Sequence, residues 1–206
     1  MSESKNQRDP IESSGFEVRC GLTLAFLAAV MAITDLGAGR YGDDEIIAHN
    51  QMTNAYNWYQ AHAIKEDLKE NKRDLLRIMV DSGKLPAKTH EKVISTLNTE
   101  IELLKKEKEE ILLGSAAVGE SAWIIEEDGK LGQLKGATEW ERETEELGAA
   151  GDNFDLSVLF FHICLVMGAI SLTLKGERMR NFFYFSMVSL GVIGIYFSAV
   201  AFLEAI

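Results

Sequence analysis

Cysteine, proline and positive charge are all scarce in this sequence. Two cysteines in 206 residues are too few for a disulfide scaffold or a cysteine-based zinc site. Two prolines, without a glycine repeat, exclude a collagen-like or low-complexity chain. Lys and Arg number 21 against 32 Asp and Glu, and the resulting net charge of -11 argues against a nucleic-acid-binding protein.

Recognisable catalytic motifs are lacking as well. The sequence contains no GxSxG nucleophile elbow, no GxxxxGK[ST] phosphate loop and no HExxH zinc motif. We therefore expect a protein that is not an enzyme, with no catalytic residue, no metal ligand and no cofactor.

Three segments almost lack charge, and their lengths are close to that of a transmembrane helix. They are residues 20–36, 156–174 and 182–203. A helix rises about 1.5 Å per residue, so the last two span roughly 28–33 Å, the thickness of a bilayer core. The alternative is three buried helices of a soluble core, but the remaining chain is too short to cover them. The sequence predicts three transmembrane helices and the lipid bilayer as a partner.

The first of these segments allows a second interpretation. It ends at Gly37-Ala38-Gly39, and small residues are typical of a signal-peptide cleavage site. The preceding tail, however, holds four acids (Glu3, Asp9, Glu12 and Glu17), whereas a secretory leader begins with a basic region. We expect an uncleaved anchor.

Basic residues near the segment ends predict the orientation. Six of them lie before the first segment or between the last two: Lys5, Arg8, Arg19, Lys175, Arg178 and Arg180. Positive charge marks the cytoplasmic side. The predicted regions are a cytoplasmic tail (1–19), a first span (20–39), an extracytoplasmic domain (40–155), a second span (156–174), a cytoplasmic turn (175–181), a third span (182–203) and an extracytoplasmic tail (204–206). In a bacterium the membrane is the inner one and the domain is periplasmic.

The region between the first two spans has the pattern of two helices. Heptad spacing links positions 50 to 78 and again positions 90 to 111, and Gly83-Lys84-Leu85-Pro86 separates the two series. An antiparallel, coiled-coil-like hairpin is expected. It would pack Ile64, Leu68, Leu75 and Ile78 on Ile94, Leu97, Ile101 and Leu104.

Glycines weaken the pattern after residue 113. We expect a short helix over 116–127, a charged helix over 137–147 and a flexible joint at 148–153. The fold class is thus an all-α membrane protein, with the hairpin inserted between the first and second spans.

Amide and aromatic side chains gather just after the first span. The candidate interaction residues are Asn50, Asn54, Asn57, Trp58, Tyr59 and Gln60. Asparagine in a heptad seam costs stability and sets register and oligomeric state. We expect Asn54 and Asn57 to contact another subunit or residues 114–136, and not the second hairpin helix. Packing on the hairpin or anchoring at the membrane surface is the alternative for Trp58 and Tyr59.

Two ionisable residues are expected within the membrane. Asp35 lies near the outer end of the first span, and His162 lies seven residues into the second. Such residues are expensive in lipid and are candidates for function, including transport. The alternative is a neutral histidine that hydrogen-bonds to a neighbouring helix.

Two short motifs carry a family resemblance. Asn57-Trp58-Tyr59-Gln60-Ala61 and Asp152-Asn153-Phe154-Asp155 resemble segments of a bacterial membrane family known as domain of unknown function 4337. The likeness extends over most of residues 20–203, and it departs at His62, where a lysine is expected. The resemblance implies one apolar span, a helix and two further spans, and it implies no activity or cofactor.

These observations favour a structural or interaction protein that self-associates or binds a membrane partner. The alternative is a small oligomeric channel or transport accessory, whose polar vestibule would be lined by the asparagines.

Overall fold

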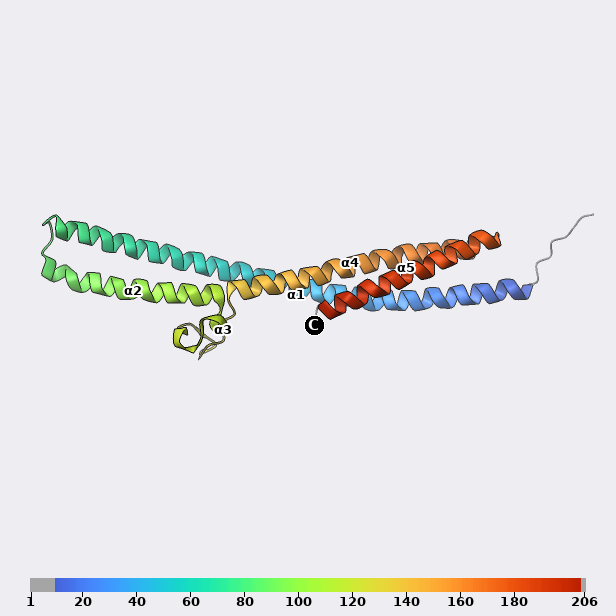
Figure 1. Cartoon of the computed structure of the whole chain (residues 1–206), viewed down its shortest axis with the longest axis horizontal. Helices are drawn as coiled ribbons and strands as arrows, with labels where there is room; N and C mark the ends of the chain where they lie inside the picture. Colours follow the sequence, from blue (N-terminus) through green and yellow to red (C-terminus); the bar gives the residue numbers. More distant parts are fainter. Residues whose placement is uncertain (1–9, 205–206) are drawn as a thin grey trace, which may run out of the picture. The chain divides into compact units, whose positions relative to one another are not determined.

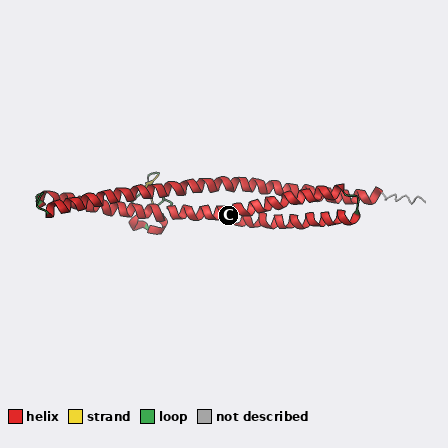
Figure 2. Ribbon diagram, turned by 90° about the horizontal axis from the view of Figure 1, so that it is seen from above, coloured by secondary structure: helices red, strands yellow, loops and turns green. Residues whose placement is uncertain are grey.

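A computed structural model describes residues 10–204, and almost all of them are helical (Figure 2). The elements are the helices α1 (Pro10–Asp81), α2 (Ala87–Leu113), α3 (Ser115–Val118), α4 (Ala137–Thr173) and α5 (Glu177–Glu204), the 3-10 turn η1 (Glu120–Ala122), and the strands β1 (Glu126–Glu127) and β2 (Lys130–Leu131). The prediction of a helical protein is confirmed.

The short helix expected over 116–127 is wrong beyond Val118, where the 3-10 turn η1 and then β1 follow. β1 pairs with β2 as a small antiparallel hairpin. Asp128 and Gly129 in its turn have positive φ values of 51° and 77°. A two-residue turn of this kind needs positive φ at both positions, and Asp-Gly supplies it at little cost. The helix itself ends earlier, at Val118, and Gly119 after it has a positive φ of 80°.

Three helices, α1, α4 and α5, are long and apolar enough to cross a membrane. Two of them are also longer than expected. α1 continues without a break to Asp81, and α4 runs through residues 148–153, where a flexible joint was predicted. A glycine inside a helix costs only about 1 kcal/mol, and the neighbouring Ala150 is fully buried. Packing thus overrides the two glycines.

The chain divides into two compact units. Unit 1 combines Met1–Asp44 with Glu146–Ile206, and unit 2 is Glu45–Glu145. α1 and α4 contribute residues to both units, because the divisions at residues 44/45 and 145/146 fall within these helices.

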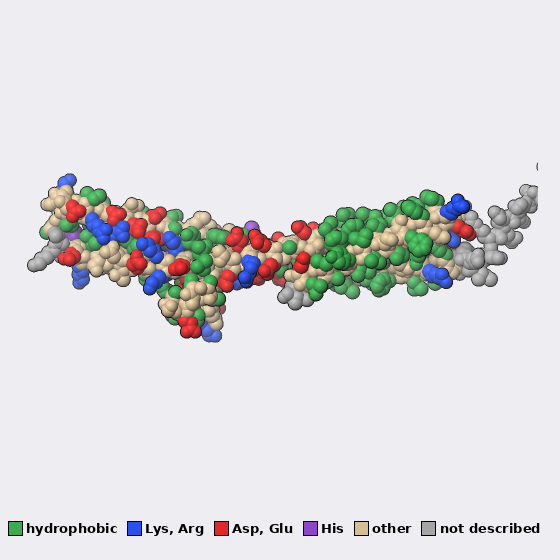
Figure 3. Space-filling model, viewed as in Figure 1, with side chains coloured by type: hydrophobic (Ala, Val, Ile, Leu, Met, Phe, Trp, Pro, Cys, Tyr) green, Lys and Arg blue, Asp and Glu red, His purple; other side chains and the backbone are tan. Residues whose placement is uncertain are grey.

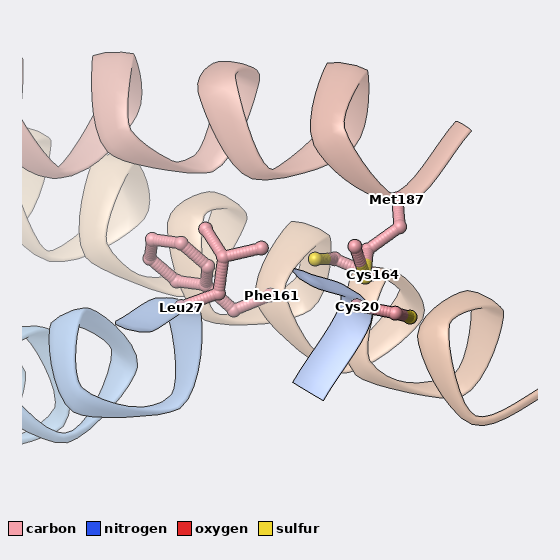
Figure 4. Packing of buried hydrophobic residues seen from close by; sticks show 5 residues of the cluster. All are labelled: Cys20, Leu27, Phe161, Cys164 and Met187. Carbon is pink, nitrogen blue, oxygen red and sulfur yellow. The ribbon is translucent and has the colours of Figure 1, made fainter. Parts of the chain in front are cut away.

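A cluster of buried side chains holds the three helices of unit 1 together. It consists of Cys20 and Leu27 from α1, Phe161 and Cys164 from α4, and Met187 from α5 (Figure 4). Both cysteines are free thiols.

Small residues let these helices approach closely. A Cβ atom on Gly191 would collide with Leu27, and one on Gly194 would press on Phe161. In lipid the hydrophobic effect does little to drive helix association, and close van der Waals packing through small residues drives it instead. Gly21 on α1, in contrast, has open space around it.

Aromatic rings close one end of unit 1. Phe154 is fully buried, stacks on Tyr41 with ring centroids 5.7 Å apart, and meets Phe202 edge-on at 5.0 Å. Gly37 lies against the same rings and leaves no room for a side chain. The second resemblance motif therefore contributes a packing residue.

Polar contacts join α1 to α2 in unit 2. They are His62–Glu107 (3.3 Å), Glu66–Lys108 (2.5 Å), Lys69–Glu100 (2.8 Å) and Glu70–Lys105 (3.5 Å). The residue numbers of the α1 partners increase along this series, while those of the α2 partners broadly decrease. The two helices therefore run side by side in opposite directions (Figure 1).

A buried carboxylate organises the segment after α2. Glu110 accepts hydrogen bonds from the Ser115 hydroxyl (2.7 Å) and from the backbone N–H groups of Ile124 (2.9 Å) and Ile125 (3.0 Å). The indole N–H of Trp123 donates to the Ser115 carbonyl (2.7 Å). These bonds satisfy polar groups that would otherwise be costly to bury, and they tie the glycine-rich segment to the end of α2.

Candidate interaction surface

α2 buries the apolar face that its heptad spacing predicts. Leu97, Ile101, Leu104 and Ile111 are each at most 7% exposed. The apolar face of α2 is therefore occupied within the chain.

The corresponding residues of α1 lie on the opposite side from α2. Ile64, Leu68, Leu75 and Ile78 are 58–65% exposed. The predicted packing of these four residues on α2 is therefore wrong within one chain. The spacing indicates a helical face, but that face does not meet the hairpin partner.

α1 presents its charged face to α2 instead. His62 and Glu66 are each 7% exposed, and with Lys69 and Glu70 they supply the polar contacts to α2. Long polar side chains can lay their carbon stems over apolar surface while their charged ends form pairs. Heptad spacing alone does not distinguish such a face from an apolar one.

We call the exposed side of α1 in unit 2 the outer face. Nine side chains with heptad spacing run along its centre: Asn50, Asn54, Asn57, Ala61, Ile64, Leu68, Asn71, Leu75 and Ile78. The residues on its two flanks differ in charge: Asp67, Asp74 and Asp81 on one, and Lys65 and Lys72 on the other. All are exposed. These charges were not singled out from the sequence, although they occupy the heptad positions directly beside the central residues.

The predicted interaction residues divide between two sides of α1. Asn50, Asn54, Asn57 and Gln60 are exposed on the outer face or beside it. Residues 114–136 thus leave Asn54 and Asn57 uncovered, and contact with another subunit stays a prediction.

The two aromatic residues of the motif lie closer to α2. Tyr59 is half-buried, and the Nζ atom of Lys108 lies 5.7 Å from its ring centroid. Trp58 is 40% exposed and meets the His62 ring edge-on at 5.8 Å. His62, the departure from the family motif, also makes a 3.1 Å contact through Nδ1 with the Trp58 carbonyl. Trp58 and His62 therefore act as one packed pair.

Electrostatic shifts in unit 2 follow these contacts. The hydrogen bond to Glu66 raises the pKa of Lys108. The hydrogen bond that Tyr56 donates to Glu141 (2.8 Å) raises the pKa of the phenol. On the flank of the outer face, a hydrogen bond from Arg73 lowers the pKa of Asp74. Each shift favours the protonation state that the groups already hold at neutral pH.

The structure places both candidate intramembrane residues on the outside of unit 1. Asp35 and His162 are exposed, and among the residues described neither has a hydrogen bond or an ion pair. The structure does not bring the two together.

Inside unit 1, hydroxyl groups of Ser and Thr form hydrogen bonds between helices. Thr34 and Ser198 share a 2.9 Å hydrogen bond between α1 and α5, and Ser157 donates to the Gly194 carbonyl (2.8 Å). Ser and Thr commonly bridge helices in lipid. A neutral hydroxyl is inconspicuous in a sequence, but the position of Thr34 and Ser157 within apolar runs is a usable signal.

The surfaces of the two units have different chemistry. Apolar side chains cover much of the visible face of unit 1, whereas both signs of charge are interspersed on unit 2 (Figure 3).

Within residues 10–204, no group of three or more His, Cys, Asp or Glu side chains is placed to hold a metal ion. The outer face is extended, and its centre is apolar at Ala61, Ile64, Leu68, Leu75 and Ile78.

A family model described as domain of unknown function (DUF4337) matches residues 16–204, and the chain belongs to that family. No curated protein and no solved structure matches it.

Proposed function

We propose that this DUF4337 protein is a membrane-anchored assembly module without a catalytic role. Unit 1 holds the chain in the bilayer, and unit 2 presents the outer face of α1 to other polypeptides. One helix face thus serves binding, and the three apolar helices serve anchoring.

One observation carries this proposal. Ile64, Leu68, Leu75 and Ile78 expose more than half of their side chains on one helix face, while the apolar face of α2 is buried. Single exposed apolar residues are ordinary, but extended apolar surface on a charged unit marks an interaction site. Burial of a Leu or Ile side chain yields about 1.5–3 kcal/mol, so covering four of them is a substantial driving force.

Basic residues support one orientation in the membrane. Arg19 precedes the first apolar segment, and Lys175, Arg178 and Arg180 surround the short connection between α4 and α5. Following the positive-inside rule, we place this end of unit 1 in the cytoplasm and unit 2 outside it, which in a bacterium is the periplasm. Reporter fusions at residues 90 and 177 should then score outside and inside, and the reverse result would overturn the orientation.

The test of the assembly role is the size of the complex in native membranes. Leu68→Asn combined with Leu75→Asn makes the outer face polar without touching α2. On blue-native gels of gently solubilised membranes, we expect this variant to migrate as a much smaller complex than the wild type.

The matched control changes two apolar residues on α2. Val93→Asn with Leu103→Asn makes the same chemical change at positions 41% and 45% exposed, and it should leave the complex intact. A complex of unchanged size in the outer-face variant would refute the assembly role.

The position of the asparagines supports a second candidate, a small channel or transport accessory. Asn50, Asn54 and Asn57 lie exposed on the same face as the apolar residues, so copies assembled through this face would direct them to a common axis. Ion flux into liposomes that contain the purified protein tests this candidate. Flux that Asn54→Leu with Asn57→Leu reduces would support it, and absence of flux would exclude it.

A further inference from the structure

The charges beside the outer face are arranged in a pattern that selects its partner. Asp67 and Asp74 lie directly before two leucines of the centre, Leu68 and Leu75, and Lys72 lies directly after Asn71. In heptad terms the acids occupy the g positions and the lysines the e positions. One edge of the face is acidic and the other basic.

We infer that the outer face binds the same face of further copies of this chain, parallel and in register. In a parallel arrangement a g residue faces the e residue of the next heptad on the neighbouring helix. Asp67 then faces Lys72 of a second copy. Gln60 faces Lys65, and Asp74 faces the uncharged Met79. In an antiparallel arrangement, g meets g and e meets e, so acids would face acids and lysines would face lysines. Charge complementarity therefore favours a second copy and fixes its direction.

The asparagines define the register. Each asparagine lies opposite the same asparagine of a second copy only when the parallel helices are in register. These residues are Asn50, Asn54, Asn57 and Asn71. A shift of one heptad would place Asn54 against Ala61 and Asn57 against Ile64. Pairing an amide with an apolar side chain leaves its hydrogen-bonding groups unsatisfied. Copies anchored in one membrane by unit 1 are also held at the same depth.

The apolar residues indicate the number of copies. Leu68 and Leu75 occupy a positions, and Ile64 and Ile78 occupy d positions of the heptad. Leucine at a with isoleucine at d favours trimers or tetramers over dimers. The assembly therefore has more than two copies, with each α2 on the outside.

This inference rests on the proposed function, and it adds the identity of the partner. Disulfide crosslinking between identical positions tests it in the full chain within membranes. Cys20 and Cys164 are buried in unit 1 and are first replaced, by Cys20→Ser and Cys164→Ser. Single cysteines are then introduced by Asn57→Cys, Leu68→Cys or Ile78→Cys.

Helices that are parallel and in register bring all three positions within disulfide reach, where Cα atoms lie about 4.4–6.8 Å apart. We expect a covalent dimer of this chain from each of the three variants. Ser95→Cys, exposed on α2, is the control and should give at least roughly fivefold less, because disulfide formation demands this close approach. A crosslink at only one of the three positions, or an equal yield at Ser95, would overturn the inference.

Charge exchange provides a second readout that does not depend on cysteine. Asp67→Lys or Lys72→Asp alone places like charges opposite each other, and we expect roughly threefold or more loss of the oligomer. The double variant restores the pair with its charges exchanged, and it should recover the oligomer to within about twofold. A double variant as weak as the single ones would contradict a pairing between Asp67 and Lys72.

The outcomes separate this inference from the proposed function. If Leu68→Asn with Leu75→Asn reduces the native complex but no covalent dimer of this chain forms, a different polypeptide occupies the outer face. The assembly role would then stand, and self-association would fall. If the native complex does not change, the assembly role itself fails.

Discussion

Unit 2 contains two apolar helix faces with the same heptad spacing and opposite burial. On α2, Leu97, Ile101 and Leu104 are at most 7% exposed, whereas Leu68 and Leu75 on α1 are 65% and 58% exposed. A heptad pattern thus identifies a face that associates, but it does not identify the partner. The apolar face of α2 has a partner within the chain, and we infer that the apolar face of α1 finds one in another copy.

The side of α1 that meets α2 explains how both faces coexist on one molecule. Its contacts are polar, as in the pairs of Glu66 with Lys108 and of Lys69 with Glu100. Partly exposed ion pairs contribute little, about 0–1 kcal/mol each. The stability of the α1–α2 pair therefore depends largely on the apolar residues of α2, and the apolar residues of the outer face of α1 stay free.

The largest expected difference is between truncations on the two apolar faces. Ile101→Ala should destabilise unit 2 by about 2–5 kcal/mol, because it leaves a cavity at a position that is only 1% exposed. At protein concentrations where the chain is monomeric, Leu68→Ala should change the stability by no more than about 0.5 kcal/mol. Hydrogen exchange of α2 amides in the full chain measures both effects. Equal losses would mean that the two faces do not differ in burial.

A smaller effect is expected at the end of the buried face. Glu110→Gln replaces a carboxylate oxygen by an amide N–H group that faces backbone donors, which costs about 1–3 kcal/mol. Glu109→Gln is the control, because Glu109 is exposed. Hydrogen exchange should rise across residues 114–136 in the first variant and stay unchanged in the second. Equal exchange in both variants would show that Glu110 does not hold this segment.

The smallest effect is expected from the polar contacts between α1 and α2. A double-mutant cycle of Glu66→Gln and Lys108→Met should give a coupling of about 0.2–1 kcal/mol that falls with added salt. A coupling above about 3 kcal/mol would mean that charges, and not the apolar face of α2, hold the pair together.

The same pair has a defined pH dependence. The pKa of Lys108 is raised above its ordinary value of 10.5 by the Glu66 hydrogen bond. Its contribution to stability is therefore complete below pH 10.5 and is lost as the pH rises through the raised value. The cycle repeated at higher pH should show this loss, and a coupling that grows with pH would contradict the assignment.

Much of the architecture could be predicted because it depends on local composition. Charge-free runs predicted three helices able to cross a membrane, and heptad spacing predicted the buried side of α2. The buried position of Glu110 could not be predicted, because Lys105, Lys106 and Lys108 beside it suggest a solvated helix. Its environment is created by the Ser115 hydroxyl and by backbone N–H groups some 15 residues away.

The choice between the two sides of α1 also lay beyond the sequence. Ile64 and Ile78 have the spacing of a hairpin seam, and they have equally the spacing of a seam between chains. The charged side around Glu66 gave no local sign that it would be the one to meet α2. Such a choice depends on the competition between intrachain and interchain contacts, which a single sequence does not express.

Native mass spectrometry of the full chain in mild detergent measures the number of copies in the complex. We expect the wild type to be a complex of more than two copies of the 22.9 kDa chain, and we expect Leu68→Asn with Leu75→Asn to release single chains. A wild type that is monomeric, or a complex that survives both substitutions, would contradict the claim that the outer face of α1 joins copies of this protein.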